Sequence, residues 1–489
     1  MNLPPMHVLL AASELHPFSK TGGLADAVAA LGQAAAQAGC RVTIVTPLYR
    51  GIAAKHPGIR RTGWKFDLPL GKDLVSGEFW QLDLSPGLSI WFVNQPAFFD
   101  RPGLYNEGQR DYADNAQRFL FLTKAAMLAA RYHPEPPSII HGHDWQVGLL
   151  PLLVHFARVT GSWPDAPRTV FTIHNLAYQG VFPVEAWQYT NLPWSWFHLE
   201  SAAHFGRLNF LKGALYLADA LTTVSPRYAV EICTTEYGCG LEGILRRREH
   251  DLTGILNGVD YQEWNTQANP ALPFAYDAQH PAGKAANKEA LQAEMGLAVD
   301  ASVPLFGNIS RLTDQKGCDL ILAALERLMP GTRLQFVLLG SGDPELQEAF
   351  QALAAEYPGK VAVRIGFDAR LAHRIEAACD FYLMPSRFEP CGLNQMYSLR
   401  YGAIPIVRCT GGLADSVTDA RDDPDRANGI HFHEPTAEAL VWAIRKALAV
   451  HEDPEAFRHF RLNGMTADFS WEKQAAEYLR LYGDVLHGP

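Results

Sequence analysis

The sequence predicts an α/β protein of two domains, each built on a parallel sheet, with a cleft between them. At 489 residues the chain is longer than one hydrophobic core usually supports. Short apolar runs alternate with helical patterns in both halves, as in βαβ units. Several runs end in glycine pairs, cations or carboxylates, and open α/β sheets bind ligands at the carboxyl ends of their strands.

Composition and charge limit the class of partner. A hydrophobic content of 48% with 11% aromatic residues argues against disorder. The net charge of −10, from 42 basic and 52 acidic residues mixed along the chain, argues against nucleic acid and against an anionic membrane as partners. Any positive charge that binds an anionic substrate must therefore be local.

The cysteines and the N-terminal run indicate a cytoplasmic protein. Seven cysteines lie scattered, without a CxxC pair that would favour a zinc site, and this usage suits a reducing compartment. The apolar run at residues 8–12 is too short to span a membrane and lacks the flanks of a secretion signal.

The first half opens with a βαβ unit. A strand at 7–12 and a helix at 24–38 flank the loop Lys20-Thr21-Gly22-Gly23, and a strand at 41–46 follows. Gly22 and Gly23 before a helix let backbone amides approach an anion, and Lys20 adds positive charge. A flexible loop with a solvated lysine fits this motif equally well. Residues 64–93 are β-rich and predict an antiparallel insertion or edge strands.

Two later strands of the first half end in polar residues. One runs into His141-Gly142-His143-Asp144-Trp145, and the strand at 168–173 ends in His174-Asn175. His141 and His143 alternate and so share a strand face, but no further ligands at matching spacing favour a metal site. We expect these strand ends to line one cleft.

A stretch with a Gly/Asn turn and prolines lies at residues 252–281, and we place the domain junction there. The predicted domains are residues 1–252 and 253–470, and the second repeats the alternation of strands and helices. Gly340-Ser341-Gly342 matches G-x-G-x-x-G only in part, because Glu345 occupies the third glycine position, so no dinucleotide site is predicted. The expected strands span residues 305–309, 335–339, 361–365, 381–384 and 404–407.

Charged residues follow two of these strands, and a glycine pair follows a third. Arg311 and Lys316 lie in the loop expected after the strand at 305–309, Glu389 follows the strand at 381–384, and Gly411-Gly412 follow the last strand. Arginine binds phosphate with a planar fork and lysine as a point charge, so the pair suits a diphosphate. A lone cation is usually surface charge, but the recurrence of such groups at strand ends favours a ligand site.

Taken together, these motifs resemble those of bacterial glycogen synthases. These enzymes form, with plant starch synthases, a family of retaining glucosyltransferases. They occur in the family's order from residue 20 to residue 415. The motifs are Lys20-Thr21-Gly22-Gly23-Leu24, His141-Gly142-His143-Asp144-Trp145, Thr172-Ile173-His174-Asn175, Ser310-Arg311-Leu312-Thr313 with Gln315-Lys316-Gly317, Pro385 to Leu393, and Thr410 to Asp415.

The resemblance implies a GT-B fold, with two Rossmann-like domains facing each other across an interdomain active-site cleft and residues 471–489 forming a helix that crosses back to the first domain. It implies transfer of glucose from a nucleotide-glucose, ADP-glucose in bacteria, to the non-reducing end of an α-1,4-glucan such as glycogen. It also implies no metal and no cofactor. Asp423-Pro424-Asp425 looks like a metal-binding DxD motif but lies in a charged loop.

The resemblance also assigns roles to residues. Arg311 and Lys316 would hold the diphosphate, and Glu389 would position the donor glucose with the amides near Cys391 and Gly392. His174 would contact the glucose 6-hydroxyl, with its carbonyl facing the anomeric carbon. The remaining expected contacts are Asp144 at the acceptor side, Lys20 at the phosphate, Phe367 stacking on the base where some relatives carry tyrosine, and Asn175, Gly22, Gly23, Thr410, Gly411 and Gly412 at the substrates.

Several alternatives stay open at this stage. Retention fits either a nucleophilic carboxylate, Glu389 or Asp144, or front-face attack assisted by the leaving phosphate, which we prefer because the site offers cations more plainly than a carboxylate pair. Rival functions are another GT-B transferase that makes sucrose or a glycoside, a pyridoxal-dependent glucan phosphorylase, and an inactive glucan-binding scaffold. The choice between ADP-glucose and UDP-glucose and the oligomeric state are also open.

Overall fold

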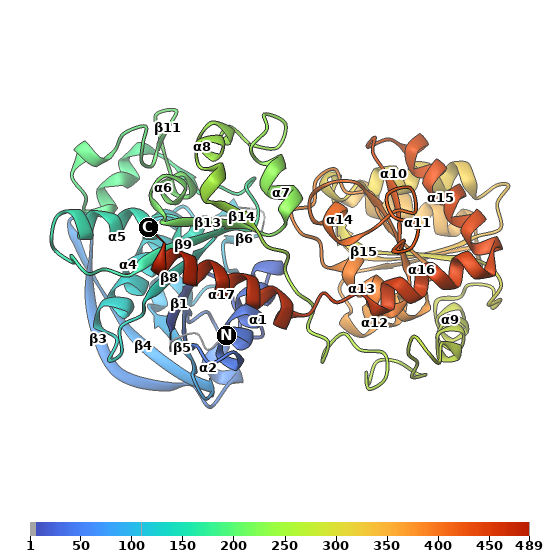
Figure 1. The fold of residues 1–489 in the computed structure, drawn as a ribbon, viewed down its shortest axis with the longest axis horizontal. Coiled ribbons are helices and arrows are strands. Elements are labelled where there is room, and N and C mark those ends of the chain that lie inside the picture. The colour runs from blue at the N-terminus through green and yellow to red at the C-terminus, as the bar shows by residue number, and fades with distance from the viewer. Residues whose placement is uncertain (1–5, 109, 489) are drawn as a thin grey trace. The chain divides into compact units, whose positions relative to one another are not determined.

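The computed structural model describes residues 6–108 and 110–488 and divides the chain into two compact units (Figure 1). The first unit holds Met1–Val224, Ala229–Ile255 and Trp471–Pro489. The second unit holds Ser225–Tyr228 and Leu256–Ser470. The main change between units, after Ile255, lies close to the junction expected after residue 252. Among the described residues, no helix has the length and apolar character needed to cross a membrane.

The first unit is built on a nine-stranded sheet in the order β14-β13-β9-β8-β1-β2-β5-β4-β3. Seven strands pair in parallel, with Leu9 of β1 opposite Thr43 of β2 and Ile140 of β8. These are β1 (His7–Ala11), β2 (Arg41–Pro47), β5 (Leu88–Asn94), β8 (Ile139–His143), β9 (Arg168–Ile173), β13 (Ala220–Thr223) and β14 (Leu252–Gly254).

The β-rich stretch forms the edge of this sheet as an antiparallel hairpin of β3 (Arg60–Leu70) and β4 (Asp73–Ser85). Both strands are longer than the apolar runs that predicted them, because polar residues at their ends continue the pairing. Arg60, for example, forms an ion pair with Asp83 across the hairpin. The predicted antiparallel edge is confirmed.

The helices of the first unit follow from apolar periodicity. Helix α1 (Gly23–Gln37) buries Leu24, Val28, Leu31 and Ala35 on one face. The C-terminal helix α17 (Trp471–His487) packs against α1 within this unit. Other elements are α2 (Ile52–Lys55), α3 (Pro96–Phe99), β6 (Asn106–Glu107), β7 (Arg110–Asp111), α4 (Asn115–Tyr132), α5 (Leu150–Val159), β10 (Val181–Phe182), β11 (Ala203–His204), β12 (Arg207–Asn209), α6 (Phe210–Leu217) and α8 (Glu242–Arg247). Helix α7 (Pro226–Glu231) has residues in both units.

The second unit is a six-stranded parallel sheet in the order β17-β16-β15-β18-β19-β20. The chain starts at the central β15, runs outward through β16 to β17, and returns to β18 on the other side of β15. The strand order therefore reverses between β15 and β18, the position at which open α/β sheets bind ligands. The strands are β15 (Leu305–Leu312), β16 (Gln335–Gly342), β17 (Val361–Ile365), β18 (Phe381–Met384), β19 (Ile404–Arg408) and β20 (Ile430–Phe432).

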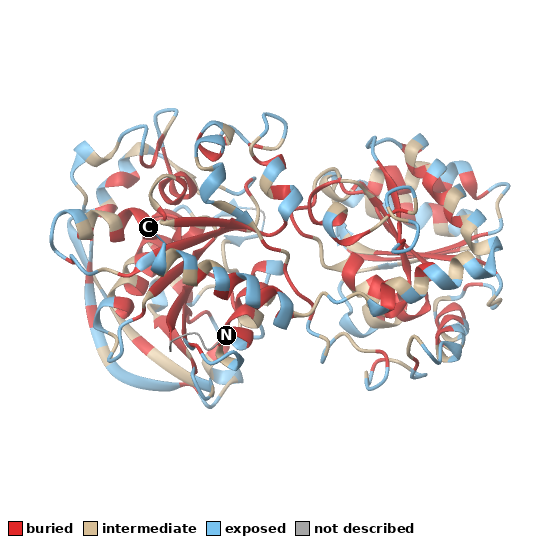
Figure 2. Ribbon diagram, in the orientation of Figure 1, coloured by how far each residue is buried: buried red, intermediate tan, exposed pale blue. Residues whose placement is uncertain are grey.

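Helices cover both faces of this sheet, so most of its strand residues are buried, and exposure begins only toward the carboxyl ends of β15, β16 and β17 (Figures 1 and 2). Phe336 and Leu338 of β16 pack on one face, with α10, α11 and α15, while Val337 and Leu339 pack on the other, with α9 and α12. The helices are α9 (Ala282–Met295), α10 (Cys318–Leu328), α11 (Pro344–Glu356), α12 (Ala369–Ala378), α13 (Asn394–Tyr401), α14 (Gly411–Ser416), α15 (Ala437–Glu452) and α16 (Pro454–Thr466).

One expectation about this sheet is wrong. Arg311 lies in strand β15, opposite Ser341, and not in the loop that follows. The partial glycine motif on β16 explains the longer pairing, because a Cβ at Gly340 would lie 2.2 Å from the Ser310 carbonyl oxygen and one at Gly342 2.3 Å from that of Leu312. These glycines serve strand pairing.

Removing a buried ring from the second unit should destabilise it strongly. Phe336 is fully buried, so Phe336→Ala should lower the free energy of unfolding by about 3–5 kcal/mol. The matched control is Phe367→Ala, whose ring is 94% exposed and whose loss should change stability by less than about 0.5 kcal/mol. Urea denaturation followed by circular dichroism measures both, and equal losses would contradict the assigned core.

Candidate functional site

In the second unit, the carboxyl ends of three neighbouring strands carry the predicted ligand-binding residues. Arg311 is the residue before the last in β15, the loop Pro385–Leu393 follows β18, and Thr410, Gly411 and Gly412 follow β19. Lys316 lies in the short turn between β15 and α10. The structure thus gathers at one edge of the sheet residues that are up to about a hundred positions apart in sequence.

An ion pair joins two of these segments. Lys316 Nζ lies 2.6 Å from Glu389 Oε2, and the Ser386 hydroxyl donates to the same oxygen at 3.0 Å. The Glu389 side chain is only 7% exposed and that of Lys316 is 20% exposed, so water screens the pair weakly. Within the described part of the chain Glu389 Oε1 accepts no hydrogen bond, which leaves one carboxylate oxygen available to a ligand.

Arg387 fastens the loop after β18 to the segment after β15. Its guanidinium donates to both carboxylate oxygens of Asp319, at 2.8 Å each, and its backbone N–H donates to the Gln315 carbonyl at 2.8 Å. This bidentate geometry is the strong form of such a pair. The sequence analysis assigned no role to Arg387, and no local sequence signal marks its partner.

Gly411 and Gly412 allow the segment after β19 to approach the Glu389 loop. Gly411 has a φ of +46°, and a Cβ there would lie 1.9 Å from the Glu389 carbonyl oxygen. A Cβ at Gly412 would lie 2.0 Å from the Cys391 carbonyl oxygen, and the Gly412 N–H donates to the Glu389 carbonyl at 3.1 Å. Their smallness is therefore needed for packing within the protein, whatever ligand binds beside them.

Gln395 orients the backbone around Cys391 and Gly392. Its side-chain amide donates to both of their carbonyls at 3.1 Å and to the Ser416 hydroxyl at 2.9 Å. Burial raises the pKa of the Cys391 thiol to about 12, so this cysteine stays protonated and is not a nucleophile. No local sequence signal marks Gln395, the second residue of the ordinary helix α13, for this role.

Arg311 and Phe367 are the exposed members of the predicted set in the second unit. Among the described residues the Arg311 guanidinium has no ion-pair partner. Phe367 is 94% exposed and follows Gly366, whose φ of +131° turns the chain at the end of β17. Both side chains are free to contact a ligand at the carboxyl ends of the strands.

In the first unit, the adjacent strands β8 and β9 bring Asp144 and His174 together. The His174 N–H donates to Asp144 Oδ1 at 2.8 Å, and Asn175 follows directly on the same strand end. Burial raises the pKa of Asp144 to about 7, although these backbone donors oppose the shift. Asp144 has a φ of +59°, unusual for a residue with a side chain.

The histidines near these strand ends are neutral. His143 Nδ1 lies 3.1 Å from His174 Nε2, and burial lowers the pKa of His174 to about 3 and that of His143 well below its usual value. His141 is not part of a pocket wall, because it is fully buried and bonds Thr172 Oγ1 at 2.6 Å and the Tyr482 hydroxyl of α17 at 2.7 Å. It fastens the C-terminal helix.

A buried carboxylate that the sequence analysis missed organises the Lys20 loop. Glu14 accepts from the Thr21 N–H at 2.5 Å, the Thr21 hydroxyl at 2.6 Å and the Tyr105 hydroxyl at 2.6 Å. Gly22 is the residue before α1 and has open space around it, and Gly23 begins the helix. Lys20 forms an exposed ion pair with Asp26 at 2.8 Å.

The described residues contain no group of three or more histidine, cysteine, aspartate or glutamate side chains that could hold a metal ion. In the DxD-like segment, Asp423 accepts backbone N–H groups of Asp425 and Arg426 and so forms a local turn.

Family models and curated relatives match almost the whole chain. A model described as the starch synthase catalytic domain matches residues 7–247, and one described as glycosyl transferases group 1 matches residues 296–460. A glycogen synthase of Anaeromyxobacter dehalogenans (strain 2CP-C) is 48% identical over 98% of this chain and 99% of its own. One of Syntrophotalea carbinolica is 43% identical over 98% of both chains.

Two solved structures share the fold. The catalytic domain of starch synthase IV from Arabidopsis thaliana, bound to ADP and acarbose, superposes with a TM-score of 0.89 at 33% identity, over 99% of this chain and 100% of that one. A sucrose-phosphate synthase from Thermosynechococcus elongatus gives a TM-score of 0.62 at 19% identity over 99% of this chain and 100% of its own, a likeness of fold alone.

The raised pKa of Asp144 predicts a pH-dependent stability difference. Between pH about 4 and 7 the folded protein keeps a proton on Asp144 that the unfolded chain has lost, so this group makes the free energy of unfolding fall as pH rises. Asp144→Asn removes that effect. The free energy of unfolding of the variant, relative to that of the wild type, should therefore rise by about 1–3 kcal/mol as the pH rises from 4.5 to 7.5. Urea denaturation of both proteins measures this difference. A difference that does not change with pH would contradict the buried, protonated state.

Proposed function

The chain belongs to the glycogen synthase family of glycosyltransferases and has a GT-B fold, and on this premise we propose that it transfers glucose from ADP-glucose to the non-reducing end of an α-1,4-glucan with retention of configuration. The observation that carries the proposal is the arrangement of Arg311, Lys316 and Glu389 at the point where the strand order of the second unit reverses. Cations beside a partly available carboxylate suit a sugar diphosphate.

We assign the diphosphate to Arg311 and Lys316. Breaking the bond between glucose and phosphate leaves positive charge on the sugar and negative charge on the departing ADP, and fixed cations stabilise the latter. Lys316 is held by Glu389 with donors to spare, and Arg311 is exposed. Lys20 would add to this charge. Its exposed pair with Asp26 costs little to break, since such pairs contribute about 0–1 kcal/mol.

We assign the donor glucose to Glu389 and the backbone around it. The free Oε1 of Glu389 can accept a hydrogen bond from a sugar hydroxyl. Gln395 donates to the Cys391 and Gly392 carbonyls and so fixes the direction of the neighbouring amides. Gly22, Gly23, Thr410, Gly411 and Gly412 would offer backbone close to the substrates.

The first unit would supply neutral polar groups. His174 is uncharged and its ring can share a hydrogen bond with the glucose 6-hydroxyl, while Asp144 and Asn175 would bind the acceptor. Neutral groups suit sugar hydroxyls because they bind them without competing for the diphosphate.

For the chemical step we propose front-face attack. The acceptor hydroxyl attacks the anomeric carbon from the side of the leaving group, and the departing phosphate oxygen takes its proton. The Glu389 carboxylate has one oxygen bound by Lys316 and Ser386, which lowers its reactivity as a nucleophile. A glucosyl adduct trapped on Glu389 or Asp144 would favour double displacement instead.

The proposed reaction uses only protein groups and its two substrates, glycogen and the nucleotide sugar. Arg311 and Lys316 supply the positive charge that a metal ion supplies in other transferases. The scattered placement of the seven cysteines along the sequence supports a cytoplasmic setting for the reaction.

The deciding assay follows radiolabelled glucose from ADP-glucose or UDP-glucose into glycogen or into fructose 6-phosphate. We expect label in glycogen, with ADP-glucose as the better donor. Label in fructose 6-phosphate alone would indicate a sucrose-phosphate-forming enzyme, and no label in any acceptor would indicate a scaffold.

Removing either cation should slow turnover without unfolding the protein. Arg311→Ala or Lys316→Ala should lower kcat by about 10²–10³-fold, the usual effect of losing one preorganised charge-stabilising group. Arg327→Ala is the matched control. Arg327 lies in α10, the helix after the same turn, and forms an exposed ion pair with Glu438 of α15. Wild-type kcat in either site variant, with an unchanged melting temperature, would contradict the assignment.

Loss of the exposed ring should weaken donor binding. Stacking of a base on an aromatic side chain contributes about 1–3 kcal/mol, so Phe367→Ala should raise KM for ADP-glucose by about 5–150-fold. Phe367→Tyr keeps an aromatic ring and should leave KM for ADP-glucose close to the wild-type value. Since the acceptor is bound elsewhere, KM for glycogen should stay the same, and an unchanged KM for ADP-glucose would rule out the stacking role.

A further inference from the structure

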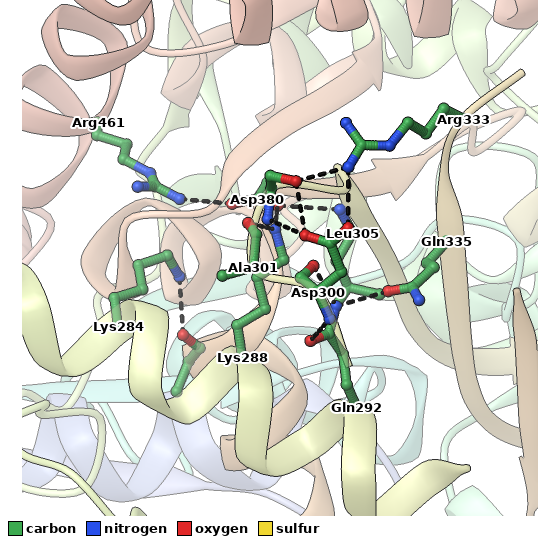
Figure 3. Close-up of polar contacts among 12 residues, drawn as sticks. Lys284, Lys288, Gln292, Asp300, Ala301, Leu305, Arg333, Gln335, Asp380 and Arg461 are labelled. Carbon is green, nitrogen blue, oxygen red and sulfur yellow. Dashed lines mark hydrogen bonds and ion pairs between the residues drawn. The ribbon is translucent and has the colours of Figure 1, made fainter. Parts of the chain in front are cut away.

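A charged cavity lies at the opposite edge of the second unit's sheet from Arg311, at the amino ends of the strands. Its volume is about 380 Å³. Asp380, directly before β18, lines it, and the Asp380 carboxylate also accepts the N–H of Leu305, the first residue of β15, at 2.9 Å (Figure 3). The side chains that line it include Lys284 and Lys288 of α9, His451 of α15 and Arg461 of α16.

The charges in this cavity do not balance. Asp380 is shared by two cations: Lys288 Nζ lies 2.5 Å from one carboxylate oxygen and Arg461 Nη2 lies 2.7 Å from the other (Figure 3). The side chains of Lys288 and Asp380 are 3% and 5% exposed. Buried charge without a counter-charge is costly, so a cavity with more cations than carboxylates favours an anion.

Lys284 lies beside these groups, but burial lowers its pKa to about 7, so its charge is partial near neutral pH. Its ammonium donates to the carbonyls of Glu376 at 3.3 Å, Ala377 at 3.0 Å and Tyr401 at 2.9 Å, at the C-terminal ends of α12 and α13. Burial raises the pKa of the Glu376 carboxyl to about 8, and this group accepts from the Ser398 hydroxyl at 2.8 Å. A neutral Glu376 leaves in place the excess of positive charge that Lys288 and Arg461 have over Asp380.

Arg461 has donors that the described protein does not use. Its guanidinium meets Asp380 through one nitrogen only, and its Nε–H is buried without any partner. The ring of Phe457 lies 4.1 Å from the guanidinium carbon and fixes its plane. The cavity also adjoins the first turn of α9, where Pro281 provides no side-chain cap and the helix dipole is positive.

We propose that this cavity binds a small anion through a phosphoryl group. A planar guanidinium with unused donors, a lysine ammonium and an uncapped helix start are the groups that recognise phosphate oxygens. The site is separate from the proposed donor site, since Leu305 begins β15 here and Arg311 lies near the end of the same strand, at the other edge of the sheet. It does not depend on the proposed glucosyl transfer.

The test is calorimetric titration of the full-length chain with inorganic phosphate, with saturating ADP present and chloride used to hold ionic strength constant. ADP occupies the proposed donor site, so any phosphate that binds must bind elsewhere. We expect one phosphate per chain and, because the ligand binds the folded state, a rise in melting temperature with phosphate concentration. No binding would overturn the proposal.

Ala285→Glu locates the site without removing an existing contact. Ala285 is exposed and lines the cavity, so a carboxylate there would compete with the anion. We expect phosphate affinity to fall at least about tenfold, as an added like charge a few ångströms away requires. The matched control is Ala293→Glu, an exposed position on the same helix outside the cavity lining, which should bind as the wild type does. Equal affinity in the Ala285→Glu variant and the wild type would place any phosphate elsewhere.

Glycerol phosphate distinguishes the source of the phosphoryl group. A cavity of about 380 Å³ has room beyond one phosphate. Tighter binding of glycerol phosphate than of inorganic phosphate would identify a phosphate ester as ligand, and tighter binding of inorganic phosphate would identify the free ion. Loss of both in Ala285→Glu is expected, and retention of both would contradict the proposal.

Discussion

The ion pair between Lys316 and Glu389 connects the two strand-end segments between which the strand order of the second unit reverses. Parallel strands bring their carboxyl ends to one edge, and here β15 and β18 are neighbours although some 70 residues separate them in sequence. Arg387 with Asp319 strengthens the same connection. Because a weakly screened pair holds both side chains, the ammonium and the free carboxylate oxygen are fixed before any ligand arrives, which is the condition for electrostatic catalysis.

The two units differ in the electrostatic character of their predicted sites. The second unit offers cations, whereas burial keeps His143 and His174 of the first unit neutral and raises the pKa of Asp144 to about 7. Charge suits a diphosphate and neutral polar groups suit sugar hydroxyls, so each unit matches one half of a glucosyl transfer. The second unit also has a cation-rich cavity at the other edge of its sheet, and β15 runs between the two places.

Most of the sheet and helix pattern could be predicted, because buried strands and amphipathic helices have clear periodicities. The strands predicted at residues 361–365 and 381–384 are confirmed to the residue. Residues at strand ends could be predicted as a group, since parallel strands share an edge. Arg311 was wrongly placed in a loop, because the pairing that extends β15 depends on small residues of another strand, Gly340 and Gly342.

The supporting residues could not be predicted, because each acts on a distant partner. Glu14 bonds Tyr105 across 91 positions, Arg387 bonds Asp319 across 68, and Gln395 bonds Ser416 across 21. No local pattern distinguishes such an arginine or glutamine from a surface residue. The roles of Asp144, His174 and Glu389 rest on resemblance and geometry together.

The most direct test of glucosyl transfer follows ADP-glucose and a maltooligosaccharide by proton NMR. We expect the anomeric signal of the glucosyl phosphate to be replaced, one for one with released ADP, by that of a new α-1,4 linkage. A β-linked product, or free glucose without chain extension, would contradict it.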